Sequence, residues 1–89
     1  MITFCFTKQA ERIFLKLPKS IQERCLEKLR ELKTHPDIFS VLKQLTGVPP
    51  ASHRMRIGNY RLILELRTHA KQSVKFWILD VGHRKDIYR

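Results

Sequence analysis

The sequence contains few residues that break secondary structure. It holds only three Gly and four Pro among 89 residues, whereas 43% of its residues are hydrophobic. This composition argues against a disordered or collagen-like chain and is typical of a small globular protein. We expect residues 1–89 to form a single domain, which at this size buries roughly 60% of the surface that the unfolded chain exposes.

Cysteines and long apolar runs are also scarce. Cys5 and Cys25 stand far apart and the four histidines are scattered, which fits neither a disulfide framework nor a metal site. No apolar run approaches the roughly 18 residues of a membrane span. The N-terminus lacks the basic region of a secretory signal. We therefore expect a cytoplasmic protein with reduced cysteines and with no metal, cofactor or membrane partner.

Acidic residues are few, at eight against 18 Lys and Arg, so the formal net charge is +10 and the pI is about 10.2. Such an excess of positive charge favours an anionic partner, which could be nucleic acid, an acidic protein or a membrane surface. Residues 53–89 hold nine basic and three acidic residues, a net charge of +6 in 37 positions. The positive charge is therefore densest in the C-terminal part of the chain.

That part begins with a predicted β-hairpin, HRMRIGNYRLILELR, over residues 53–67. Gly58-Asn59 separates two alternating runs, and Gly in the first position suits a two-residue type II′ turn. Because side chains alternate along a strand, three apolar residues share one face: Met55, Leu62 and Leu64. Three arginines share the other face: Arg54, Arg56 and Arg61.

This turn places Arg56 directly opposite Arg61. Like charges in that position destabilise a sheet. An anion on the arginine face would relieve the repulsion, and guanidinium groups suit phosphate oxygens. The alternative is a solvated edge whose long side chains splay apart.

The remaining patterns predict an α+β fold. It comprises an N-terminal strand, a two-helix antiparallel hairpin packed on one face of the sheet, and a three-stranded antiparallel meander. Thr7 is the expected N-cap of the first helix, and Ser20 and Glu23 form a capping box for the second. The expected helices cover residues 8–17 and 20–35. The expected strands lie near residues 2–7, 53–57, 60–67 and 73–81.

The last two strands are expected to pair across a polar loop over residues 68–72. In this register Leu64 faces Phe76 and Leu62 faces Ile78 on the core side. On the arginine face, two further pairs support it: Glu65 with Lys75 and Ile63 with Trp77. The last strand then ends at Gly82 beside the Gly58 turn, so the C-terminal tail leaves near the arginines.

These groups suit RNA strand scission without a metal. Guanidinium groups can stabilise charge on a phosphorane-like transition state, while the ribose 2′-OH must lose a proton and the leaving oxygen must gain one. His83 is the nearby candidate for these proton transfers, because histidine is the usual acid–base side chain, and Tyr88 can stack on a base or donate a proton. Each residue also has a purely structural alternative: His83 as a histidine in a loop, and Tyr88 as a tyrosine that only packs against its neighbours.

Two stretches, RMRIGNYRLILEL and VKFWILDVGHRKDIYR, resemble the RelE-like toxins of toxin–antitoxin pairs. The order of elements is similar to theirs over nearly all of the chain. The resemblance implies a RelE-like fold and a ribosome-dependent mRNA endoribonuclease, or mRNA interferase, that leaves a 2′,3′-cyclic phosphate and inhibits translation. It also implies three kinds of partner: a cognate antitoxin, the ribosome and mRNA.

Carried over by position, the resemblance places Arg54 at the scissile phosphate and Arg61 and Arg84 at phosphate-stabilising positions. Tyr88 corresponds to the base-stacking tyrosine, and we expect His83 to be catalytic as well. Three further basic residues are expected to bind RNA phosphates: Arg56, Lys85 and Arg89. The sequence departs from the best-known members in having Ser52 and His83 where they carry lysines.

Two other functions remain open. A ParE-like toxin shares the fold but poisons DNA gyrase by protein contact and cuts nothing. A basic binding module of the same fold would have lost the activity. The cluster of Arg61, Arg84 and Tyr88 favours the nuclease, because a gyrase poison does not need it.

Overall fold

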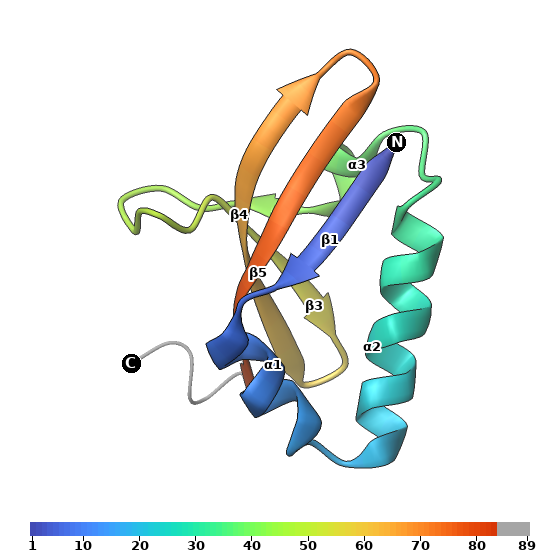
Figure 1. The fold of residues 1–89 in the computed structure, drawn as a ribbon, viewed down its shortest axis with the longest axis vertical. Helices are drawn as coiled ribbons and strands as arrows, with labels where there is room; N and C mark the ends of the chain where they lie inside the picture. Colours follow the sequence, from blue (N-terminus) through green and yellow to red (C-terminus); the bar gives the residue numbers. More distant parts are fainter. Residues whose placement is uncertain (84–89) are drawn as a thin grey trace.

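The computed structural model describes residues 1–83, which form a mixed sheet and three helices (Figure 1). Along these residues the strands are β1 (Ile2–Phe6), β2 (Lys43–Gln44), β3 (His53–Ile57), β4 (Tyr60–Ala70) and β5 (Ser73–His83). The helices are α1 (Lys8–Leu15), α2 (Lys19–Leu32) and α3 (Ile38–Val41). The predicted α+β fold is therefore confirmed.

The five strands form one sheet in the order β1-β5-β4-β3-β2. β3, β4 and β5 are the predicted antiparallel meander, and β1 pairs with β5 in parallel. A parallel pair needs a long crossover between its strands, and here the helices lie on that connection. Figure 1 shows α2 running beside the sheet and α1 crossing near its lower end.

The first helix begins as predicted, with the Oγ1 of Thr7 accepting a hydrogen bond from the backbone N–H of Ala10 at 3.1 Å. The capping box predicted for the second helix is wrong. α2 begins at Lys19 with Pro18 as its N-cap and has no side-chain cap. Ser20 therefore lies inside the first turn, where its side chain is past the capping position. Instead, the side-chain amide of Gln22 ties α2 to the end of α1 and to the connector by donating to the carbonyl oxygens of Leu15 at 3.2 Å and Leu17 at 2.9 Å.

The core lies between the helices and one face of the sheet. The predicted burial of four strand residues is confirmed, because each is at most 1% exposed: Leu62, Leu64, Phe76 and Ile78. The α2 stripe of Cys25, Leu29 and Leu32 belongs to the same core. Burial raises the pKa of the Cys25 thiol to about 11, so the thiol stays protonated. No helix of the described chain is long and apolar enough to cross a membrane.

The predicted register between β4 and β5 is wrong. The strands continue to Ala70 and Ser73, which pair across a two-residue connection, so the expected loop over 68–72 is mostly strand. Leu64 therefore pairs with Ile78 rather than with Phe76. The strand end is nevertheless where it was expected, because Gly82 pairs with Arg61, three residues from the Gly58 turn.

Two bulges interrupt the alternation of side chains along β4 and β5. Leu79 is an extra residue in β5 between the partners of Ile63 and Leu64, and Arg67 is an extra residue in β4 between the partners of Phe76 and Lys75. A bulge reverses the facing of the residues beyond it. Ile78 and Val81 are three residues apart, yet both are buried at 3% exposure or less.

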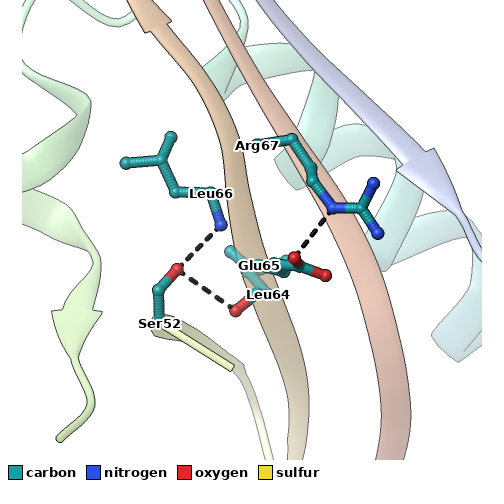
Figure 2. A network of polar contacts seen from close by, with 5 residues as sticks. All are labelled: Ser52, Leu64, Glu65, Leu66 and Arg67. Atoms are coloured by element: carbon teal, nitrogen blue, oxygen red, sulfur yellow. Dashed lines mark hydrogen bonds and ion pairs between the residues drawn. The ribbon is translucent and has the colours of Figure 1, made fainter. Parts of the chain in front are cut away.

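Ser52 anchors the connector before β3 to β4 (Figure 2). Its Oγ accepts from the backbone N–H of Leu66 at 2.8 Å, and its own N–H donates to the carbonyl oxygen of Leu64 at 2.8 Å. These bonds extend the antiparallel pairing beyond the end of β3. Ser52, which departs from the lysine expected from the resemblance to RelE-like toxins, thus has a structural role in this chain.

Candidate nucleic-acid interface

Three arginines lie on the sheet face turned away from the helices, which we call the arginine face: Arg54, Arg56 and Arg61. The predicted register is confirmed, since Arg56 pairs with Arg61 and Arg54 pairs with Ile63. Gly58 has a φ of +58°, and no residue other than glycine has a positive φ in the described chain. This geometry matches the type II′ turn that the Gly-Asn order predicts.

The three arginines differ in exposure. Arg61 is buried at 6% exposure, Arg54 is half-buried and Arg56 is exposed. The Nε of Arg56 donates to the carbonyl oxygen of Gly58 at 3.3 Å, so this side chain bends towards the turn. The pair is therefore not two splayed surface side chains, because one member is enclosed by the protein. A buried guanidinium exerts a stronger field on a neighbouring charge than a solvated one does.

The structure does not place His83 with the arginines. His83 pairs with Tyr60 across the sheet, and their rings are in T-shaped contact with centroids 5.6 Å apart. Cross-strand partners share a face, and Tyr60 alternates with Arg61, so His83 lies on the helix side. The predicted grouping of His83 with the three arginines is wrong in this respect, whereas its catalytic role stays a prediction.

Four other predicted site residues lie outside the described residues: Arg84, Lys85, Tyr88 and Arg89. Their roles also stay predictions.

A second histidine, His53, is buried and is part of the core. It is 9% exposed and its ring lies 5.6 Å from both Phe39 and Phe76, measured between centroids. Burial lowers the pKa of His53 below its usual value, which favours the neutral ring. Its Nδ1 lies 2.9 Å from the Oγ of Ser52. Because His53 alternates with Arg54 along β3, it faces away from the arginines.

The sequence patterns placed Trp77, Lys75 and Glu65 on the arginine face but did not predict that they form a group with Arg67, centred on the Trp77 ring. Glu65 pairs with Trp77 across β4 and β5, and Glu65 alternates with Arg61 through Ile63. The guanidinium carbon of Arg67 and the ammonium nitrogen of Lys75 each lie 5.5 Å from the indole centroid. Figure 2 shows Arg67 paired with Glu65, whose Oε2 accepts from the Nε of Arg67 at 2.8 Å. The available signal was a tryptophan on the polar side of an otherwise apolar strand.

No group of three or more His, Cys, Asp or Glu residues within residues 1–83 is arranged to hold a metal ion. Within these residues the arginine face presents cations, the carboxylate of Glu65 and the indole ring of Trp77.

Comparisons with known proteins agree with this fold. Residues 5–88 match the family model of the ParE toxin of the type II toxin–antitoxin system parDE. No curated protein gives a significant sequence match.

RelE toxins are among the solved structures that resemble the chain. The RelBE2 toxin–antitoxin complex of Mycobacterium tuberculosis gives a TM-score of 0.72 at 30% identity, covering 92% of this chain and 90% of that one. The RelB–RelE complex of Methanococcus jannaschii gives 0.64 at 26% identity, covering 94% of both chains. The isolated Escherichia coli RelE toxin gives 0.66 at 23% identity, covering 91% and 82%, a likeness in fold.

The family match covers most of the chain, and the overall fold is similar to that of the solved toxins. The chain is therefore a type II toxin–antitoxin toxin and belongs to the RelE/ParE superfamily.

Proposed function

We propose that this toxin is a ribosome-dependent endoribonuclease that cuts mRNA without a metal. The observation that carries the proposal is the directly opposed Arg56–Arg61 pair with Arg54 on the same face. Opposed arginines destabilise the sheet by themselves. A phosphate that lies between them would be bound by the same charges. The face therefore suits a strand of RNA.

The proposed chemistry is attack of the ribose 2′-oxygen on the adjacent phosphorus. The 2′-O–P bond forms, the P–O5′ bond breaks, and the products are a 2′,3′-cyclic phosphate and a 5′-hydroxyl. Arg61 and Arg54 stabilise the developing charge on the phosphate oxygens, and we assign Arg84 the same role. Arg56, Lys85 and Arg89 bind neighbouring phosphates, while Tyr88 stacks on a base.

The proton transfers require a side chain that can both accept and donate a proton. Arginine is a poor general base because it stays protonated, and His53 is enclosed in the core. His83 remains the proposed acid–base group, although it pairs with Tyr60 on the helix side of the sheet. His83 is the last residue of β5, so we propose that its imidazole reaches an RNA strand on the arginine face around the end of this strand. This arrangement is consistent with a reaction that proceeds only on the ribosome, which orients the RNA.

A second candidate function is poisoning of DNA gyrase without nuclease activity. The match of residues 5–88 to the ParE toxin model favours it. For either function we propose a cognate antitoxin as partner, because the matched toxins of Mycobacterium tuberculosis and Methanococcus jannaschii are in toxin–antitoxin complexes. An acidic antitoxin segment would complement the net charge of +10.

Brief expression of the chain in bacteria separates these functions. Primer extension on translated mRNAs should reveal new 5′ ends within coding regions, and an mRNA whose start codon is removed should remain intact. Supercoiling by purified gyrase should be unaffected by the protein. The Arg61→Ala variant is the matched control and should produce no new 5′ ends. Growth arrest with intact mRNA and inhibited gyrase would contradict the nuclease and support the ParE-like function.

A further inference from the structure

Trp77 occupies an unusual position for a large aromatic residue. It lies in the middle of β5, is half-buried, and faces away from the helices and the main core. Its neighbours in the strand, Phe76 and Ile78, fill the core at 0% exposure. The ring therefore adds little to the packing that holds the helices on the sheet.

Two cations are held at this ring. Arg67 and Lys75 each lie 5.5 Å from the indole centroid, within the range of a cation–π contact. Arg67 reaches the ring from the bulge in β4, where it is also paired with Glu65. The alternative is a purely internal cation–π cluster. Yet Arg67 has 53% of its side chain exposed, so this side chain remains accessible to an anion from solvent.

An aromatic ring between cations is the combination that single-stranded nucleic acids require. Bases stack on aromatic side chains, and the backbone phosphates bind nearby Lys and Arg. Glu65, the partner of Trp77, lies four positions after Arg61 in β4, which corresponds to roughly 13 Å along an extended strand. Both groups lie on the same sheet face, and a single RNA strand can reach from one to the other.

We propose that Trp77, with Arg67 and Lys75, forms a second subsite that binds single-stranded RNA by stacking one base on the indole ring. It is separate from the phosphate site at Arg54 and Arg61 that we propose for cleavage. The inference rests on RNA being the ligand of the arginine face, but it does not require cleavage. The subsite would set how the RNA strand runs across the sheet.

The chain contains a single tryptophan, so its fluorescence reports on this subsite alone. The probe is a 2′-O-methyl oligoribonucleotide of about ten nucleotides, which has no free 2′-hydroxyl and cannot be cleaved. Titration into the full-length protein should quench the Trp77 emission. Inorganic polyphosphate and a duplex of the same sequence should quench it far less, because neither offers an unstacked base. Equal quenching by polyphosphate would overturn the stacking subsite.

Variants test the same point by anisotropy of a labelled oligonucleotide. Trp77→Leu should weaken binding roughly tenfold, the lower part of the range for one lost stacking contact. Lys75→Ala should weaken binding and lower the salt dependence by about one ion. Glu65→Gln should strengthen binding, because it removes a carboxylate from the subsite. Lys28→Ala, exposed on α2, is the charge-matched control and should bind as the parent does.

The outcomes separate this inference from the proposed nuclease. Quenching by the oligonucleotide together with intact mRNA in cells supports the subsite and contradicts cleavage. Cleavage that persists while Trp77 emission and Trp77→Leu affinity stay unchanged overturns the subsite and leaves the nuclease in place. Thermal melts of each variant show whether it is folded, and the fluorescence titration needs no variant at all.

Discussion

Arg56 and Arg61 are direct partners across the β3–β4 hairpin, but only Arg61 is buried, at 6% exposure. Arg56 is exposed and bends to the Gly58 carbonyl. Arg56 can therefore move its charge away from the repulsion, whereas the buried side chain of Arg61 cannot. This asymmetry predicts different results when each arginine is replaced.

Replacing Arg61 should reduce catalysis. We expect Arg61→Ala to lower the cleavage rate of mRNA on programmed ribosomes by about 10²–10³-fold, as for loss of one preorganised electrostatic donor. The effect should appear in kcat more than in KM. Arg61→Lys should recover only part of the rate, because lysine lacks the planar guanidinium fork.

Folding must be followed in the same experiment, because Arg61 is buried and its truncation also removes packing. Thermal melts of both variants provide that measurement. An Arg61→Ala protein that is folded and cleaves at the parental rate would show that Arg61 has no role in the chemical step.

Replacing Arg56 should stabilise the fold. Arg56→Thr removes the repulsion and introduces a β-branched residue, which we expect to raise the free energy of unfolding by about 0.2–1 kcal/mol. Urea denaturation at low and at high salt is the measurement. The gain should shrink at high salt, because ions screen the interaction of exposed charges. A loss of stability at low salt would mean that the hydrogen bond to Gly58 outweighs the repulsion.

His53 should make stability depend on pH. Its pKa is lowered in the folded chain by burial, whereas the unfolded chain has the usual value of 6.5. As the pH falls through 6.5 the unfolded state therefore takes up a proton that the folded state refuses, and the free energy of unfolding decreases. The decrease ends below the folded pKa. Urea midpoints between pH 5 and 7.5 should show this slope.

His53→Phe should keep the ring packing against Phe39 and Phe76 and flatten this slope. His69→Gln is the control, since His69 also contacts the Phe39 ring, with centroids 4.8 Å apart, but is exposed. If His69→Gln flattens the slope and His53→Phe does not, the assignment to His53 is wrong.

Ser52 should matter for stability far more than Ser20. Ser52→Ala leaves the N–H of Leu66 without the oxygen that now accepts from it at 2.8 Å. We expect a cost of about 1–3 kcal/mol in the free energy of unfolding, with faster hydrogen exchange at Leu66. Ser20→Ala should cost much less, because Ser20 caps no helix. Equal costs at the two positions would contradict the anchoring role of Ser52.

Much of the fold was predictable from local patterns. The Gly58-Asn59 turn and the alternation around it predicted the hairpin register, because in a two-residue turn the partners follow directly from the turn position. Thr7 likewise predicted where α1 begins, because a threonine side chain caps the free N–H groups of the helical turn that follows it. These predictions depend on contacts between residues near in sequence, so no knowledge of distant segments was needed.

The β4–β5 register was not predictable in this way. The connecting turn lies between Ala70 and Ser73 rather than in the expected longer loop, and this moves the pairs along both strands. Leu79 and Arg67 are extra residues in opposite strands, so only the pairs between the two bulges are offset by one position from the rest. Whether a strand bulges depends on how its neighbours pack on both faces, which the alternation of one strand does not reveal. The same reason explains His83: the bulge at Leu79 reverses the facing that continuous alternation along β5 would give.

The sequence by itself determined that an unusually basic chain folds as a helical hairpin on an antiparallel meander, with Arg54, Arg56 and Arg61 on one face. Charge, turn chemistry and periodicity are local properties, and each is readable in the printed residues. Only the tertiary structure decided that Arg61 is enclosed, that His83 lies on the other face, and that Arg67 and Lys75 meet at Trp77. Those relationships depend on bulges and on pairing between distant strands, where one residue of shift moves a side chain to the opposite face.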